Sequence, residues 1–122
     1  MRRLLLVEDE PILREAFTLM MSTQPYLVDT AEDGQIALER CRQAEYDLIL
    51  LDLMMPVLDG VGFLRQFTPL KPAKTKIIIM SNLSSGKELE TALDLGVERS
   101  VLKASMSPKD LLSMVRYELE AY

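Results

Sequence analysis

Hydrophobic and polar residues along this chain group into blocks that predict five strands and five helices in alternation. Five short runs rich in apolar residues, each closed by a polar residue or a turn, predict the strands: residues 4–7, 26–28, 47–51, 76–80 and 99–102. Two of them, 47–51 and 76–80, carry continuous apolar stretches without alternation. Such stretches are typical of strands buried on both faces, as in a parallel sheet.

Helical spacing and start signals fill the gaps between these strands. A first helix is predicted to begin at Pro11 and to end before Gln24-Pro25. Its apolar residues recur at helical spacing: Ile12, Leu13, Ala16, Phe17 and Met20. Further helices are predicted over residues 35–42, around Phe63, Leu64 and Phe67, from the capping box at residues 85–88 to Gly96 with Leu89, Ala92 and Leu93 inside, and from Ser107-Pro108 to Leu119. Residues 68–74, with two prolines, are predicted to be a loop.

Strands alternating with helices predict the α/β class. Right-handed crossovers between such units give a parallel sheet covered by helices on both faces. The chain shows no linker, repeat or low-complexity tract, so we expect one domain over residues 1–122. A stand-alone protein and a domain cut from a longer chain are both compatible with the sequence.

Composition narrows the function mainly by exclusion. The net charge of −5 argues against sequence-independent nucleic-acid binding, which needs a basic surface. No stretch is apolar over the length that a bilayer requires, so we expect no membrane segment. The single cysteine, Cys41, favours a reducing compartment, and the absence of histidine removes the commonest general base.

Polar side chains that could carry chemistry follow the predicted strands. Glu8 and Asp9 follow the first strand, Asp52 the third, Ser81 the fourth and Lys103 the fifth. Because the carboxyl ends of parallel strands meet at one edge, where open α/β sheets place their functional groups, we expect these side chains to be neighbours. Three crowded carboxylates favour a divalent cation such as Mg²⁺, and a carboxylate such as Asp52 can attack phosphorus.

These residues carry a resemblance over the whole chain. The acidic pair Glu8-Asp9, the segment Asp52-Leu53-Met54-Met55-Pro56 with Asp59-Gly60, the strand-end Ser81, and Lys103 occur in the order typical of receiver domains of bacterial response regulators, which the chain resembles. The resemblance implies a flavodoxin-like, doubly wound sheet of five parallel strands in the order 2-1-3-4-5, with five helices.

The resemblance also implies a function and a set of roles. A histidine kinase or phosphotransfer protein would phosphorylate Asp52, with Mg²⁺ held by Asp9, Asp52 and the Met54 backbone carbonyl and contacted by Glu8 through water. Ser81 and Lys103 would hold phosphate oxygens. The domain would be a cytoplasmic switch without metabolic turnover or direct nucleic-acid binding. It would act on an effector through the face of its fourth helix, fifth strand and fifth helix, a face compatible with a phosphorylation-linked dimer.

Some positions depart from the family pattern. Ser100 stands where an aromatic residue usually relays the signal, Ala104 where a proline usually follows the lysine, and Asn82 where a small alanine is common. Met54 and Leu83, which in the family flank the path of the hydrolytic water, are apolar, and this predicts a long-lived phosphate. Two alternatives stay open: a phosphate-independent interaction module, favoured by Ser100 and Ala104, and a phosphatase, disfavoured because Met54 replaces a second acid.

Overall fold

The chain folds into one parallel sheet between two layers of helices. A computed structural model describes residues 1–82 and 86–120, and the predicted roles of Leu83, Ser85 and Tyr122 lie outside that part. The five strands are β1 (Arg2–Val7), β2 (Tyr26–Ala31), β3 (Leu48–Leu51), β4 (Lys76–Ser81) and β5 (Arg99–Leu102). They are all parallel, in the order β2-β1-β3-β4-β5, which confirms the predicted fold class and strand order.

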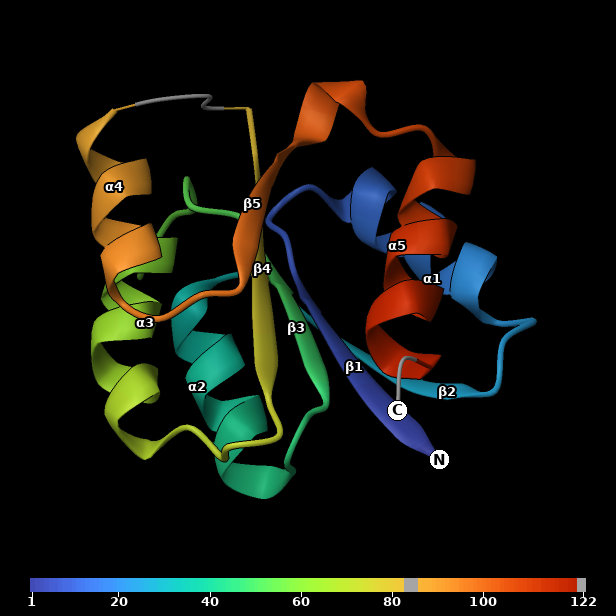
Figure 1. Cartoon of the computed structure of the whole chain (residues 1–122), viewed down its shortest axis with the longest axis horizontal. Coiled ribbons are helices and arrows are strands. Elements are labelled where there is room, and N and C mark those ends of the chain that lie inside the picture. The colour runs from blue at the N-terminus through green and yellow to red at the C-terminus, as the bar shows by residue number, and fades with distance from the viewer. Residues whose placement is uncertain (83–85, 121–122) are drawn as a thin grey trace.

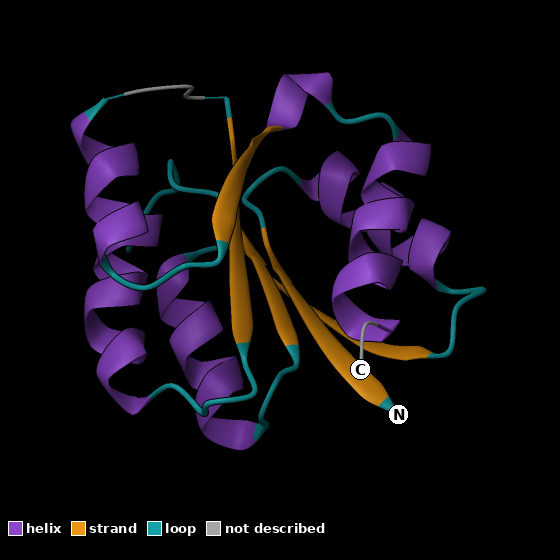
Figure 2. Cartoon of the chain, viewed as in Figure 1, coloured by secondary structure: helices purple, strands orange, loops and turns teal. Residues whose placement is uncertain are grey.

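Helices cover both faces of this sheet. Helices α2 (Gly34–Gln43), α3 (Gly60–Phe67) and α4 (Lys87–Asp94) lie on one face, and α1 (Pro11–Met21) and α5 (Pro108–Glu120) on the other (Figure 1). Two short 3-10 turns, η1 (Thr68–Leu70) and η2 (Lys103–Ser105), complete the elements of the described residues (Figure 2). The prediction that residues 68–74 lack regular structure was therefore wrong for η1, where Pro69 sits in a turn that tolerates its missing N–H.

Successive residues of the central strands point to opposite faces and build two cores. Leu5, Val7, Ile49, Leu51 and Ile79 pack with Phe63 and other residues on the side of α2, α3 and α4. Their neighbours Leu4, Leu6, Leu48, Leu50 and Ile78 pack with Phe17 and Val115 on the side of α1 and α5. This explains the unbroken apolar runs in the sequence, because strands covered on both faces have no solvent side.

The sheet ladder extends several strands beyond their predicted bounds. β2 pairs with β1 from Tyr26↔Arg2 to Ala31↔Val7, so it runs three residues past the predicted end at Val28. β1 begins at Arg2, and β4 includes Ser81 as its last residue. The polar residues Asp29 and Thr30 interrupt the apolar pattern of the edge strand β2, so the pattern did not predict its full length. Their backbones still pair with β1, because backbone pairing does not depend on side-chain polarity.

Two of the predicted helix faces were partly wrong. Of the apolar residues in α1, Phe17 is buried and Met20 half-buried, whereas Ile12 is 78% exposed and Leu13 39% exposed. In α4, Leu89 and Ala92 are buried as predicted, but Leu93 is 43% exposed. Periodicity identifies the helix, but it does not show how far along its length the neighbouring helix covers it.

Candidate functional site: a carboxylate cluster at the carboxyl edge of the sheet

Asp52 continues the central strand by one backbone hydrogen bond and then leaves the sheet. Its N–H donates to the Val7 carbonyl at 3.1 Å, directly after the last pair of the β1–β3 ladder. Asp52 is 9% exposed. A carboxylate held so far from water must meet a cation or hydrogen-bond donors.

The loop after Asp52 returns the chain to the strand end through a close backbone approach. The Gly60 N–H donates to the Leu53 carbonyl at 2.9 Å. A Cβ at position 60 would lie 2.6 Å from the Asp52 carbonyl oxygen, so only glycine fits there. The neighbouring Asp59 caps α3 by accepting the Gly62 N–H at 2.8 Å. The Asp59-Gly60 turn therefore fixes the loop against Asp52.

The acidic pair reaches the same edge from β1. The Glu8 N–H donates to the Ala31 carbonyl at 2.9 Å, and the Glu8 side chain is buried. One carboxylate oxygen from each of Glu8, Asp9 and Asp52 lies within 4.8 Å of the others. The structure thus brings together three of the predicted metal-ligating side chains.

Lys103 enters this cluster from the end of β5. Its Nζ lies 3.2 Å from Asp52 Oδ2 and also forms an ion pair with Glu8. Burial raises the pKa of Glu8 above its ordinary value, although the hydrogen bond from Lys103 opposes the shift. Burial alone would lower the pKa of Lys103, but the hydrogen bond with Glu8 and the charges of Asp52 and Glu8 together raise it. The protonated, positively charged form of Lys103 is therefore favoured, and it contacts Asp52.

Ser81 and Met54 take different places around Asp52. Ser81 is buried at the last position of β4 and pairs in register with Leu102, so it lies on the strand end next to Lys103. The Met54 N–H faces Asp52 Oδ1 across 3.4 Å, and its side chain is 59% exposed. Ala104 follows Lys103 within η2, and the described residues contain no cis peptide bond.

One supporting residue was missed by sequence reasoning. Arg14, on the first turns of α1, donates from Nη1 to the Glu8 carbonyl at 2.8 Å and lies 3.8 Å from Glu32. Arg14 therefore holds the acidic loop against α1. The only signal in the sequence is a basic residue one helical turn beyond Pro11, which alone would indicate a solvated side chain.

The cluster can serve two chemical purposes. Three carboxylate oxygens at this spacing match the oxygen ligands that Mg²⁺ prefers, so the residues present fit a divalent cation. A buried carboxylate next to a lysine also matches the arrangement of a nucleophile with a cationic group that stabilises an incoming anion. None of the described helices is both long and apolar enough to cross a membrane.

Comparisons with known proteins identify this arrangement. The family model of the response regulator receiver domain matches residues 4–116. A probable transcriptional regulator of Guillardia theta is 35% identical over 93% of the chain, which covers 44% of that protein. The chain spans about half or less of the length of the curated relatives it matches.

Solved structures agree with the family assignment. A CheY-like receiver domain of Methanospirillum hungatei superposes with a TM-score of 0.89 over 99% of this chain and 95% of that one. Its sequence identity is 22%, so this match supports the fold alone. The response regulator TrrA of Thermotoga maritima, solved in complex with Mg²⁺ and BeF, gives a TM-score of 0.81 at 30% identity over 97% and 99% of the two chains. The chain belongs to the response regulator receiver domains, which are signalling modules of two-component systems.

Proposed function

We propose that the chain is a phosphorylation-dependent switch that accepts a phosphoryl group on Asp52 from a histidine kinase or phosphotransfer protein. The observation that carries the proposal is the position of Asp52: a buried carboxylate at the end of the central strand, beside two other carboxylates and 3.2 Å from Lys103. The exchange takes place in the cytoplasm, in line with the single free cysteine.

Asp52 supplies the nucleophile in this reaction. A carboxylate oxygen attacks the phosphorus of the donor, the new oxygen–phosphorus bond forms, and the bond from phosphorus to the donor's histidine nitrogen breaks with its electron pair on that nitrogen. Lys103 stabilises the charge on the phosphoryl oxygens, and the Ser81 hydroxyl donates a hydrogen bond to one of them. The domain carries out this self-modification and its reversal without turning over a metabolite.

Glu8, Asp9, Asp52 and the Met54 carbonyl are the proposed site for Mg²⁺. The three carboxylates support it by their spacing, and the related TrrA was solved with Mg²⁺ and BeF. When bound, Mg²⁺ neutralises negative charge on the carboxylates and on phosphate oxygens. Because Lys103 already pairs with Glu8 and Asp52, the ammonium partly neutralises the cluster before a cation arrives.

The output surface is proposed to be the face of α4, β5 and α5. Leu93 of α4, Leu102 of β5 and Tyr117 of α5 are 43%, 38% and 69% exposed, so these three elements offer apolar and aromatic side chains to an effector or to a second copy. Glu118 of α5 pairs with Lys76 of β4 and Arg99 of β5, at 3.4 and 3.5 Å. These ion pairs hold α5 to the strands in a chain that has Ser100 in place of the usual aromatic relay.

A phosphate-independent interaction module on the same fold is the second candidate. Ser100 and Ala104 favour it, because both replace residues that in the family link the phosphorylation site to the distant face. Hydrogen exchange separates the two candidates in four samples: wild type and Asp52→Asn, each with Mg²⁺ and with or without acetyl phosphate. The switch predicts that hydrogen exchange in α4, β5 or α5 changes in only one of the four samples, the wild type with acetyl phosphate. Identical exchange in all four samples would reject the switch.

A further inference from the structure

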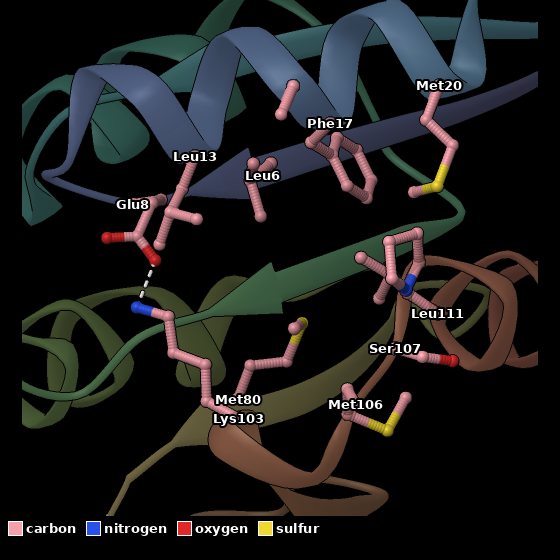
Figure 3. A pocket seen from close by; sticks show the side chains of 12 residues that line it. Leu6, Glu8, Leu13, Phe17, Met20, Met80, Lys103, Met106, Ser107 and Leu111 are labelled. Atoms are coloured by element: carbon pink, nitrogen blue, oxygen red, sulfur yellow. Dashed lines mark ion pairs between the residues drawn. The ribbon is translucent and has the colours of Figure 1, made fainter.

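A cavity of about 290 Å³ lies between α1 and α5 and adjoins the carboxylate cluster at Glu8 and Lys103. Its walls are almost entirely apolar: Leu13 and Phe17 of α1 face Leu111 of α5, with Leu6 and Met80 of the sheet between them (Figure 3). Small-molecule sites in proteins are typically concave, mostly apolar and of about 300 Å³ or more, with a few polar groups that orient the ligand.

Two small, exposed residues line the cavity where it opens to solvent. They are Ala16 on α1 and Ser107 at the start of α5. Phe17 and Met21 pack against the sheet, but Leu13 stays 39% exposed at the mouth. Met20, Met80 and Met106 also line the cavity, and their flexible thioether side chains can adapt to an occupant.

One end of the cavity is charged. The ion pair between Glu8 and Lys103 closes it there, and Figure 3 shows the carboxylate and the ammonium meeting at that end, with the apolar side chains extending away from them. Asp52 lies 3.2 Å from the same ammonium, and one carboxylate oxygen each of Glu8, Asp9 and Asp52 lie within 4.8 Å of one another. Three carboxylates therefore gather around one ammonium that contacts two of them, which makes this end of the cavity favourable for a cation.

We propose that this cavity binds a small organic ammonium ion with an apolar or aromatic body. The body would fill the space between Leu13, Phe17 and Leu111, and the ammonium would hydrogen-bond to Glu8. Lys103 can yield its place at Glu8 because Asp52 is already its second partner. A ligand carboxylate would add a fourth negative charge to the same end, and an uncharged ligand could donate a hydrogen bond to Glu8 but would lack the attraction between opposite charges.

Three probes that share a phenylethyl body test both halves of this proposal: phenethylamine, the isosteric phenethyl alcohol, and hydrocinnamate, which carries a carboxylate. Methionine ¹³C-methyl NMR reports binding directly, because Met20, Met80 and Met106 line the cavity, whereas Met1 is 83% exposed outside it. Phenethylamine should shift the three cavity signals without moving Met1. It should bind about tenfold more tightly than phenethyl alcohol, and hydrocinnamate should bind most weakly. Equal affinities for the amine and the alcohol, or shifts elsewhere alone, would overturn the proposal.

Two α1 variants form a matched pair for the same titration. Ala16→Phe fills the cavity and should abolish the shifts from phenethylamine. Thr18→Phe adds the same ring two residues along the helix, at an exposed position that does not line the cavity, and should leave them unchanged. Binding that survives Ala16→Phe, or that both variants weaken equally, would place the amine elsewhere. Glu8→Gln should remove the preference for the amine over the alcohol; a preference that persists would contradict the role of Glu8.

The consequence for signalling rests on the proposed function. An ammonium at Glu8 would leave Lys103 bound to Asp52, and the added positive charge would oppose Mg²⁺ at the adjacent carboxylates. Phenethylamine should therefore slow labelling of Asp52 by acetyl phosphate in wild type but not in Ala16→Phe. Methionine shifts without any labelling would leave the binding site standing and reject the phosphorylation function, whereas labelling without methionine shifts would do the reverse.

Discussion

Two buried aspartates flank the same strand and meet opposite surroundings. Asp47 immediately precedes β3 and Asp52 immediately follows it, and they are 6% and 9% exposed. Asp47 Oδ2 accepts the Arg3 N–H at 2.8 Å, while Oδ1 lies 3.5 Å from Arg2 and 3.8 Å from Lys74. Asp52 instead shares one lysine with Glu8 and lies beside Asp9.

The difference shows that burial alone does not distinguish a structural carboxylate from a reactive one. At the amino end of the strand, one carboxylate is surrounded by donors and cations, so it ties β1, β3 and the loop before β4 together. At the carboxyl end, carboxylates outnumber the lysine, so the cluster is stabilised further when a divalent cation arrives. The two aspartates lie five residues apart in the chain, so a variant of one serves as the control for the same variant of the other.

The largest expected effect is a difference in stability between variants at the two ends of β3. Asp47→Ala leaves the Arg3 N–H without its acceptor and removes two ion pairs, so it should lower the free energy of unfolding by about 2 kcal/mol. Asp52→Ala relieves repulsion among carboxylates and should leave stability without Mg²⁺ unchanged or higher. Urea denaturation of both variants measures the two changes. A loss at Asp52 as large as that at Asp47 would break the comparison.

A somewhat smaller effect is expected from Mg²⁺ on the wild type. Binding to the folded state alone should raise the free energy of unfolding by about 1.4 kcal/mol at ten times the dissociation constant. Asp47→Asn should keep this gain, and Asp52→Asn should lose most of it. Thermal unfolding with and without MgCl₂, at constant ionic strength, provides the measurement. Equal gains in all three proteins would place the cation away from the cluster.

Phosphate lifetime should respond modestly to Met54. The side chain is 59% exposed beside Asp52 and apolar, so it neither orients nor polarises an attacking water. Met54→Asn should shorten the lifetime of the phosphorylated protein a few-fold, as followed by intact mass after removal of acetyl phosphate. Met55→Leu, an apolar change at the next residue, serves as the control. An unchanged lifetime in Met54→Asn would remove Met54 from the hydrolytic path.

The smallest expected effect is a change of stability at alkaline pH, and it concerns Tyr46 at the amino end of β3. Burial, followed by the 2.6 Å hydrogen bond to Asp29, raises the pKa of Tyr46 above its ordinary value near 10. The folded state therefore favours the neutral phenol, whose stabilising contribution is complete below pH 10 and is lost as the pH rises above it. Tyr46→Phe should lose less stability than wild type between pH 9 and pH 11, measured by urea denaturation. Parallel losses would contradict the assignment.

Sequence reasoning succeeded where the backbone topology does the positioning. The carboxyl ends of β1, β3 and β5 must meet in a parallel sheet, so Glu8, Asp9, Asp52 and Lys103 could be predicted as neighbours, and the structure brings them together. Unbroken apolar runs likewise predicted β3 and β4, because burial on both faces leaves no polar position.

It failed where a side chain depends on distant partners. The pattern of α1 does not reveal that Ile12 stays exposed, nor that Leu13 and Ala16 line a cavity shared with α5. Several contacts depend on where long side chains reach across the fold. They are the ion pair of Asp47 with Lys74, the ion pairs of Glu118 with Lys76 and Arg99, and the hydrogen bond from Arg14 to the Glu8 carbonyl. Residue spacing within one element carries no information about those distances.

The most direct test of the account is the site of phosphorylation, determined with the two aspartates as a matched pair. Wild type, Asp47→Asn and Asp52→Asn are incubated with acetyl phosphate and Mg²⁺, and their intact masses are measured. The account predicts one added phosphoryl group on the wild type and on Asp47→Asn, and none on Asp52→Asn. An unmodified wild type, or equal labelling of Asp52→Asn, would contradict it.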